Sequence, residues 1–481
     1  MDITNLEPKA LWSQFANICA IPHPSGHEEA IINYIIDFAD KNGLKWRKDL
    51  TGNIVVAKPA TSGKESAPGV ILQAHVDMVP QKNFDKEFDF TTDPIETLIE
   101  GEWVTANGTT LGADNGIGVA SMLAILEDKT IAHPDIECLF TVEEETGLVG
   151  ANGLANDILK GKLLINLDSE DEGELYVGCA GAVNTTATLE YKEKRTSSDQ
   201  IGYNLELRGL KGGHSGIQIL LQRANANKML TRFMREQTEL NDLRISTFSG
   251  GTLRNAIPRE ADAIVAIPQE NVAAFEAAVA EFEKTVAYEN ASQENAISFK
   301  ATQIARPEKV ISRKFQARII DALTASPNGI FRMSDAMIGL VETSTNLARV
   351  GIENGKLEAL YMTRCMVNYG RVELKKMVRS VWELAGATVV EEGEYNGWAP
   401  NMDSELLKTM TASYQELYGK TPEIKAIHAG LECGIIGAKY QGLDMISIGP
   451  TMQFPHSPDE RVNIETVKKF HEFLVFSLAK L

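Results

Sequence analysis

The sequence lacks several features that mark particular classes of protein. Its 481 residues include only five cysteines, an odd number without any Cys-x-x-Cys pair, which indicates reduced thiols. Residues 1–15 have no positive cluster followed by an apolar stretch, and no later apolar run is long enough to cross a bilayer. Repeats and low-complexity tracts are also missing. We therefore expect a cytoplasmic protein without disulfides.

Basic residues are scarce relative to acidic ones. The chain has 47 lysines and arginines against 66 aspartates and glutamates, a formal net charge of -19. Such a charge repels phosphate backbones and anionic lipids, so we expect neither nucleic acid nor membrane as a partner. With 43% hydrophobic and 23% charged residues the composition is that of a globular protein, and the length predicts two domains.

The first third of the chain alternates helical and strand patterns. Ser25-Gly-His-Glu28 is typical of a capping box that begins a helix, and 117–126 also has the pattern of a helix. Short apolar runs at 70–74, 136–142 and 163–167 predict strands buried on both faces. The pattern indicates an α/β domain, a mixed sheet with helices on both faces.

The character of the sequence changes after residue 185 and returns near the C-terminus. Alternating strands and long amphipathic helices over 186–396 predict an inserted α+β domain. From 397 the first pattern resumes, with a helix from about Ser404, a strand at 445–448 and a closing amphipathic helix. We expect a first domain made of 1–185 and 397–481, interrupted by the insert.

Polar residues follow the predicted strands of the first domain, where open α/β sheets bind ligands. His75 and Asp77 come at the end of one strand, and a carboxylate beside an imidazole commonly orients a metal ligand. Asp114 lies among glycines before a helix, and Asp168 directly follows a strand. Taken singly, His75 also suits a solvated strand end, Asp114 a helix N-cap and Asp168 a turn.

Three adjacent glutamates, 143–145, follow another strand, where their repulsion favours a bound cation or proton. Alternation would send Glu144 and Glu145 in opposite directions, which would let one bind metal and the other move protons; a charged surface loop is the alternative. His456 lies in a proline-stiffened loop before the last helix. Imidazole with carboxylates suits zinc, manganese or cobalt, and a bridging carboxylate makes a dinuclear site reasonable.

The insert adds polar side chains on glycine-rich turns. They are His214 in Gly-Gly-His-Ser-Gly and Asn255 in Asn-Ala-Ile-Pro. Arg364 lies in a strand-like stretch, where an unpaired guanidinium is costly. It must therefore pair with an acid or meet an anionic ligand.

Taken together, these motifs resemble the aminoacylase and carboxypeptidase-type family of two-zinc peptidases. That family has His-x-Asp, Gly-x-x-Asp, Glu-Glu, Asp and a late His in this order, and the resemblance covers nearly the whole chain. Three strings, 73–80, 140–147 and 428–434, are most similar to its dipeptidase branch, whose members cleave Xaa-His. The last string departs from the Gly-Gly-Thr-Asp of many relatives, so His428 and Glu432 are candidates for substrate binding only.

The resemblance implies a di-zinc exopeptidase fold with the insert as a lid, and a role for each site residue. Asp114 would bridge two divalent ions, zinc first with cobalt or manganese as alternatives. One ion would also be bound by His75 and Asp168, and the other by Glu145 and His456. Glu144 would be the general base, Asp77 would orient His75, and His214 would stabilise the oxyanion, in related dimers from the opposite subunit. Asn255 and Arg364 would hold the substrate carboxylate.

The expected reaction is hydrolysis of small unblocked dipeptides, including Xaa-His and β-Ala-His. Water between two dications has its pKa lowered from about 15.7 to about 7, and Glu144 would take the proton. The same site could instead hydrolyse N-acyl amino acids or tripeptides, and a metal-binding protein without catalysis is a remoter alternative. The family also implies a homodimer formed through the lid.

Overall fold

The computed structural model describes residues 2–481. It divides into two compact units, which are considered separately. Of the described residues, the first comprises 2–179, 400–426 and 431–481, and the second comprises 180–399 together with 427–430. The domain boundary expected from the sequence falls between residues 185 and 186. Both residues lie in β9 (Gly181–Glu190), and the whole of this strand belongs to the second unit.

The first unit is built on an eight-stranded sheet in the order β1-β2-β6-β3-β7-β23-β8-β22. Its central strands β6, β3, β7 and β23 are parallel, and antiparallel strands flank them. Every residue of β3 and β6 is buried, as apolar runs in a parallel sheet require. A smaller sheet has the order β24-β25-β5-β4. The strands of this unit are β1 Lys45–Lys48, β2 Ile54–Lys58, β3 Val70–His75, β4 Thr97–Glu100, β5 Trp103–Ala106, β6 Ile136–Thr141, β7 Leu163–Asn166, β8 Glu174–Cys179, β22 Glu423–Ile427, β23 Asp444–Ser447, β24 Met452–Gln453 and β25 Arg461–Asn463.

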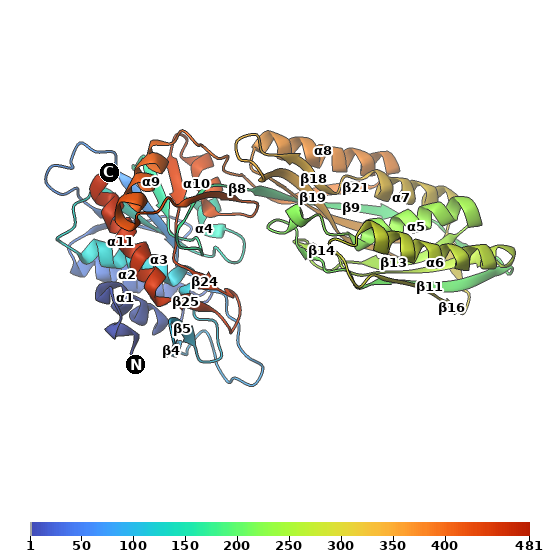
Figure 1. The fold of residues 1–481 in the computed structure, drawn as a ribbon, viewed down its shortest axis with the longest axis horizontal. Coiled ribbons are helices and arrows are strands. Elements are labelled where there is room, and N and C mark those ends of the chain that lie inside the picture. The colour runs from blue at the N-terminus through green and yellow to red at the C-terminus, as the bar shows by residue number, and fades with distance from the viewer. Residues whose placement is uncertain (1) are drawn as a thin grey trace. The chain divides into compact units, whose positions relative to one another are not determined.

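Helices of the first unit form two groups around this sheet (Figure 1). α3 packs on β3 and contacts α1 and α11, and α11 in turn contacts α9; α4 and α10 contact each other. The helices are η1 Ile3–Asn5, α1 Lys9–Cys19, α2 Glu29–Lys41, α3 Ala113–Glu127, α4 Val149–Gly153, α9 Glu405–Tyr418, α10 Glu432–Lys439 and α11 Ile464–Lys480. None of the helices in residues 2–481 has the length and apolarity that crossing a membrane would demand.

The second unit is an antiparallel sheet in the order β16-β11-β15-β13-β19-β20-β9-β21, with β18 paired to β19. A row of helices, α6, α5, α7 and α8, packs across it (Figure 1). Its strands are β9, β10 Glu193–Arg195, β11 Gln200–Arg208, β12 Gly213–His214, β13 Arg244–Gly250, β14 Ala256–Ile257, β15 Ala261–Pro268, β16 Ser298–Ile304, β17 Lys309–Ile311, β18 Gly329–Met333, β19 Val341–Glu353, β20 Lys356–Cys365 and β21 Thr388–Tyr395. Its helices are η2 Ile219–Leu221, α5 Ala226–Asn241, η3 Gln269–Asn271, α6 Val272–Glu289, α7 Arg313–Ala325 and α8 Asn368–Ala385.

The interior of the second unit lies between this helix row and the sheet. Strand β9 alternates buried and partly exposed residues, as a half-covered antiparallel strand does. Phe233 of α5 packs its ring on Phe282 of α6 and Phe299 of β16, with centroids 5.0 and 4.7 Å apart. Such aromatic contacts fix how the helices lie on the sheet.

The expected capping box at residues 25–28 does not form. Helix α2 begins at Glu29 as predicted, but no side chain caps its first turn. A bridge between Pro24 and Met78 carries the chain past β3, and there the Ser25 hydroxyl donates to Asp77 Oδ2 at 2.7 Å. Ser25 thus contributes to the site after β3 and leaves the helix uncapped.

Candidate metal centre and substrate site

Five predicted ligands come together at the carboxyl ends of the parallel strands in the first unit. His75 ends β3, and its Nε2 lies 3.2 Å from Asp114 Oδ1 and 3.3 Å from Asp168 Oδ1. The other oxygen of Asp114, Oδ2, lies 3.3 Å from His456 Nε2, which is 3.0 Å from Glu145 Oε1. Asp114 therefore stands between two groups of ligand atoms.

These distances suit a metal site. Two ligands of a tetrahedral zinc ion, each about 2.0–2.1 Å from the ion, lie about 3.3 Å apart. Glu145 Oε1 is buried, and the group closest to it is the imidazole of His456, whose Nε2 lies 3.0 Å away. His75, Asp114 and Asp168 form one group able to hold an ion, and Asp114, Glu145 and His456 form another.

Asp114 is not the N-cap that its position before a helix also allowed. Gly112 occupies the cap position of α3, and Asp114 has non-helical backbone angles within the first turn. Asp168 is likewise more than a turn residue, because its Oδ1 accepts a hydrogen bond from Asn115 Nδ2 at 2.5 Å as well as facing His75.

The carboxylates of this cluster favour the protonated form of its histidines. Burial lowers the pKa of His75, but the carboxylates of Asp168 and Asp114 outweigh burial and raise it well above its usual value. Hydrogen bonds to Asp114 and Glu145 raise the pKa of His456 to about 11. Burial raises the pKa of Asp168 to about 6. A bound cation would take the place of these protons.

Asp77 serves both the metal ligand and the glutamate loop. Its backbone carbonyl lies 3.0 Å from His75 Nδ1 and its Oδ1 3.3 Å from the same atom, which turns Nε2 toward Asp114. Its carboxylate also accepts the backbone N–H groups of Glu144 at 2.9 Å and Glu145 at 3.2 Å. The sequence predicted the first of these contacts and missed the second.

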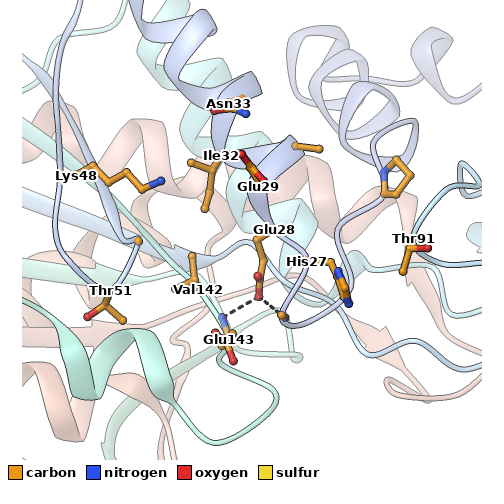
Figure 2. A pocket seen from close by; sticks show the side chains of 14 residues that line it. His27, Glu28, Glu29, Ile32, Asn33, Lys48, Thr51, Thr91, Val142 and Glu143 are labelled. Carbon is orange, nitrogen blue, oxygen red and sulfur yellow. Dashed lines mark hydrogen bonds between the residues drawn. The ribbon is translucent and has the colours of Figure 1, made fainter.

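Glu28 completes the support of the same loop. Its Oε1 accepts the N–H groups of Gly26 at 2.8 Å and Glu143 at 3.2 Å, as the dashed lines in Figure 2 show. Glu28 lies in an open groove of about 730 Å³ together with His27, Lys48 and Glu143. Three successive N–H groups, from 143 to 145, are therefore held by two carboxylates.

Glu144 and Glu145 do not diverge as strand alternation predicted. β6 ends at Thr141, and Glu143 has a φ of 48°, so the chain has left the extended conformation before the two side chains are placed. Both carboxylates lie within 4.8 Å of a His75 nitrogen. Burial raises the pKa of Glu144 well above its usual value.

Glu432 begins α10 and is completely buried. Its Oε2 accepts hydrogen bonds from Gln73 Nε2 at 2.5 Å and Thr141 Oγ1 at 2.7 Å, so it joins the ends of β3 and β6. Without exposed surface, its side chain has no direct access to a substrate in this conformation.

The second unit gathers His214, Arg364 and His428. Arg364 of β20 is opposite Ser344 of β19, and the Ser344 hydroxyl lies 2.8 Å from His428 Nε2. Burial, with the Arg364 charge, lowers the pKa of His214 to about 4 and that of His428 to about 3. Asn255 is exposed, next to the strand that pairs with His214.

Arg364 has no acidic partner among residues 2–481. It is only 5% exposed, and its Nε is buried without a hydrogen-bond partner. The alternative in which Arg364 pairs with an acid of this chain is therefore not realised, and an anionic ligand is the remaining explanation.

Comparison with known proteins identifies the family. The sequence model of peptidase family M20/M25/M40 matches residues 71–480. The chain belongs to this family. It is 44% identical over 480 residues to the cytosol non-specific dipeptidase of Escherichia coli (strain K12), covering 100% of this chain and 99% of that protein.

Solved structures of family M20/M25/M40 confirm the predicted fold class. Aminoacylhistidine dipeptidase from Vibrio alginolyticus matches with a TM-score of 0.95 and 47% identity, covering 100% of this chain and 98% of that chain. A tripeptidase from Staphylococcus aureus, 16% identical over 99% of this chain and 98% of that chain, shares the fold with a TM-score of 0.57. The resemblance read from the motifs is therefore confirmed.

Proposed function

We propose that this chain is a metal-dependent dipeptidase that hydrolyses unblocked dipeptides, Xaa-His and β-Ala-His among them. One observation carries the proposal: the two oxygens of Asp114 face two different histidines, His75 and His456. A carboxylate placed in this way can bridge two ions. The high identity to dipeptidases over the full chain supports the substrate class.

The metal would be a pair of divalent ions, with zinc preferred and cobalt or manganese as alternatives, because the donors are imidazoles and carboxylates. His75 and Asp168 would complete one coordination sphere, and Glu145 and His456 the other, with Asp114 shared. When bound, the ions would supply Lewis-acid polarisation and lower the pKa of water to about 7.

Glu144 is the proposed general base. Its carboxylate lies within 4.8 Å of possible ligand atoms of His75 and Glu145. Glu144 belongs, however, to neither of the two ligand groups that contain Asp114. Burial raises its pKa, which brings its proton affinity closer to that needed for proton transfer at neutral pH. Glu144 would take a proton from the attacking water and return it to the leaving amine.

His214 is proposed to donate a hydrogen bond to the developing oxyanion. Its Nδ1 accepts the backbone N–H groups of Gly216 at 3.2 Å and Ile217 at 3.0 Å. Because its pKa is lowered to about 4, the imidazole is neutral near pH 7, and its single proton must be on Nε2. The ring thus presents one N–H donor, the group that an oxyanion requires.

Arg364 is proposed to bind the C-terminal carboxylate of the dipeptide, with Asn255 and His428 near it. A buried guanidinium without a partner costs free energy that a carboxylate ligand would recover. His428 retains an unused buried nitrogen, Nδ1, which offers a further polar contact. Glu432, in contrast, would support the strand ends beneath the metal centre.

We further propose a homodimer formed through the second unit, in the cytoplasm. Within residues 2–481, β18 pairs only with β19, and it exposes Phe331 and Met333. An open strand edge with apolar side chains is a suitable surface for a second copy. Light scattering of the full chain would show twice the monomer mass if this is correct.

Metal reconstitution tests the function directly. Protein freed of metal with a chelator is expected to be inactive, and zinc, cobalt or manganese added singly should restore turnover of Ala-His and β-Ala-His. N-acetyl amino acids and tripeptides are the matched comparison substrates. Activity restricted to the acetylated compounds or to tripeptides would overturn the dipeptidase assignment, and full activity of the metal-free protein would overturn the metal centre.

A further inference from the structure

A buried carboxylate that has no role in the proposed reaction contacts the backbone of the candidate metal ligand Asp114. Glu460 is 2% exposed and belongs to the loop between His456 and β25. Its Oε2 accepts the backbone N–H groups of Leu111 at 2.7 Å and Gly112 at 3.0 Å. Its Oε1 accepts those of Ala113 at 2.8 Å and Asp114 at 3.3 Å.

These four N–H groups lie at the start of α3, where the first N–H groups of a helix have no partner within the helix. No local side chain caps α3. The acceptor comes from a residue 346 positions later in the chain. Glu460 thus fixes the backbone of the one residue, Asp114, whose two oxygens face His75 and His456.

The same short loop also carries His456. The Glu460 N–H donates to the Ser457 carbonyl at 3.0 Å, which closes a tight turn next to His456. On the other side, the Glu460 carbonyl accepts the Thr105 hydroxyl of β5 at 3.0 Å. The backbone N–H and the backbone carbonyl of Glu460 thus both form hydrogen bonds. Its side chain connects the loop that contains His456 to the backbone of Asp114.

We propose that Glu460 is a positioning residue that sets the distance between Asp114 and His456, and so the affinity of the site for divalent ions. The inference rests on the proposed two-metal function. Glu460 faces backbone N–H groups and belongs to neither of the two ligand groups that share Asp114. Its effect is exerted through Asp114, the shared ligand.

The charge and shape of the Glu460 side chain are both needed. In Glu460→Gln, an amide NH₂ replaces one carboxylate oxygen, so that two backbone N–H groups would face a donor in place of an acceptor. The Asp114 loop would then shift away from His456. Glu460→Asp keeps the charge but is one methylene shorter, so it should retain only part of the contact.

Glu137 provides a matched control. It is also buried, and its Oε2 accepts two backbone N–H groups, from Lys160 at 2.7 Å and Gly161 at 2.9 Å. Glu137 lies near the beginning of β6, at the opposite end of the strand from the ligands. Glu137→Gln therefore disturbs a similar structural contact far from the metal centre along the sheet.

The experiment is titration of metal-free full-length protein with Co²⁺, followed by calorimetry and by the visible absorption of the bound ion. Glu460→Gln is expected to bind Co²⁺ about 10–100-fold more weakly and with an altered spectrum, as is typical when support of a ligand is lost. Glu460→Asp should give an intermediate loss, and Glu137→Gln the affinity and spectrum of the unmutated protein.

Unchanged Co²⁺ affinity and spectrum in Glu460→Gln would overturn the proposal. If Glu460→Gln fails to fold, Glu460→Asp decides: weakened binding supports the role and unchanged binding refutes it. An equal loss in Glu137→Gln would also refute it, because the effect would then be general destabilisation. Failure of the unmutated protein to bind Co²⁺ would instead refute the two-metal function.

Discussion

The two units of the chain place their histidines in opposite electrostatic surroundings. In the first unit, His75 and His456 face carboxylates, which raise the pKa of both. In the second unit, His214 and His428 lie near Arg364, and burial with this charge lowers the pKa of both. The first environment attracts cations and the second attracts anions, the two kinds of charge that a metal-dependent peptidase must bind.

The same contrast appears in the backbones that carry these residues. Parallel strands collect their carboxyl ends at one edge, so ligands from distant parts of the sequence meet there. In the antiparallel sheet, Ser344 and Arg364 meet as cross-strand neighbours, and His428 joins from a short segment. The candidate metal ligands of the first unit therefore converge because their strands end at one edge of the sheet. The side chains of the second unit converge because of the register in which β19 and β20 pair.

The largest expected effect is on the cation-binding group of carboxylates and histidines in the first unit. Asp114→Asn removes the charge shared by both ligand groups, so we expect both ions to be lost and dipeptidase activity to fall to background. Elemental analysis after gel filtration, with a dipeptide assay, measures this. Asp128→Asn, at the other end of α3, is the control and should keep both ions. Two bound ions in Asp114→Asn would contradict the bridging role.

The next prediction separates proton transfer from metal binding within the first unit. Glu144→Gln should lower kcat by about 10²- to 10⁴-fold with both ions still bound, because a general base is lost and the ligands remain. Steady-state kinetics and metal analysis test this together. Glu143→Gln, in the groove of Figure 2, should be close to the unmutated enzyme. Unchanged turnover of Glu144→Gln would refute the base assignment.

On the anion side, Arg364→Met should raise KM for dipeptides by about 10–100-fold, corresponding to one charged hydrogen-bonded contact. Metal content should not change. Arg349→Met is a suitable control, since Arg349 is exposed and pairs with Glu358 at 2.9 Å. If KM stays the same in Arg364→Met, the substrate carboxylate binds elsewhere.

The last expected effect is on stability at acid pH and leaves the chemistry of the site aside. The unfolded chain protonates its histidines near pH 6.5, but folded His214 and His428 do so only near pH 4 and pH 3. Between these values the unfolded state binds more protons, so stability falls as pH falls, by at most about 1.4 kcal/mol per pH unit for each histidine. His428→Asn should flatten this dependence in denaturant titrations from pH 7 to pH 4; an equally steep curve would contradict it.

Several elements were predictable because their signal is local. The strands around residues 70–74, 136–142, 163–167 and 445–448 and the final helix appear where apolar runs and helical spacing indicate them. The five candidate ligands could be proposed because each matches a family motif, and because His75, Glu145 and Asp168 also lie at or just after a predicted strand. The capping box and the divergence of Glu144 from Glu145 were wrong, since both assumed regular local geometry where the chain turns.

Glu28 and Glu460 had no such signal. Each accepts backbone N–H groups from a segment more than 100 residues away, and a backbone N–H is present in almost every residue, so no sequence pattern marks the partner. The second role of Asp77, on the N–H groups of Glu144 and Glu145, was hidden for the same reason.

By itself, the sequence determined the residue types, the fold class and the family, because these follow from local patterns and from motifs in a fixed order. Only the tertiary structure decided which oxygen of Asp114 faces which histidine, that Arg364 has no acid partner within the described chain, and that Glu460 supports the Asp114 loop. These facts depend on distances between segments far apart in the chain, which the packing of strands and loops alone sets.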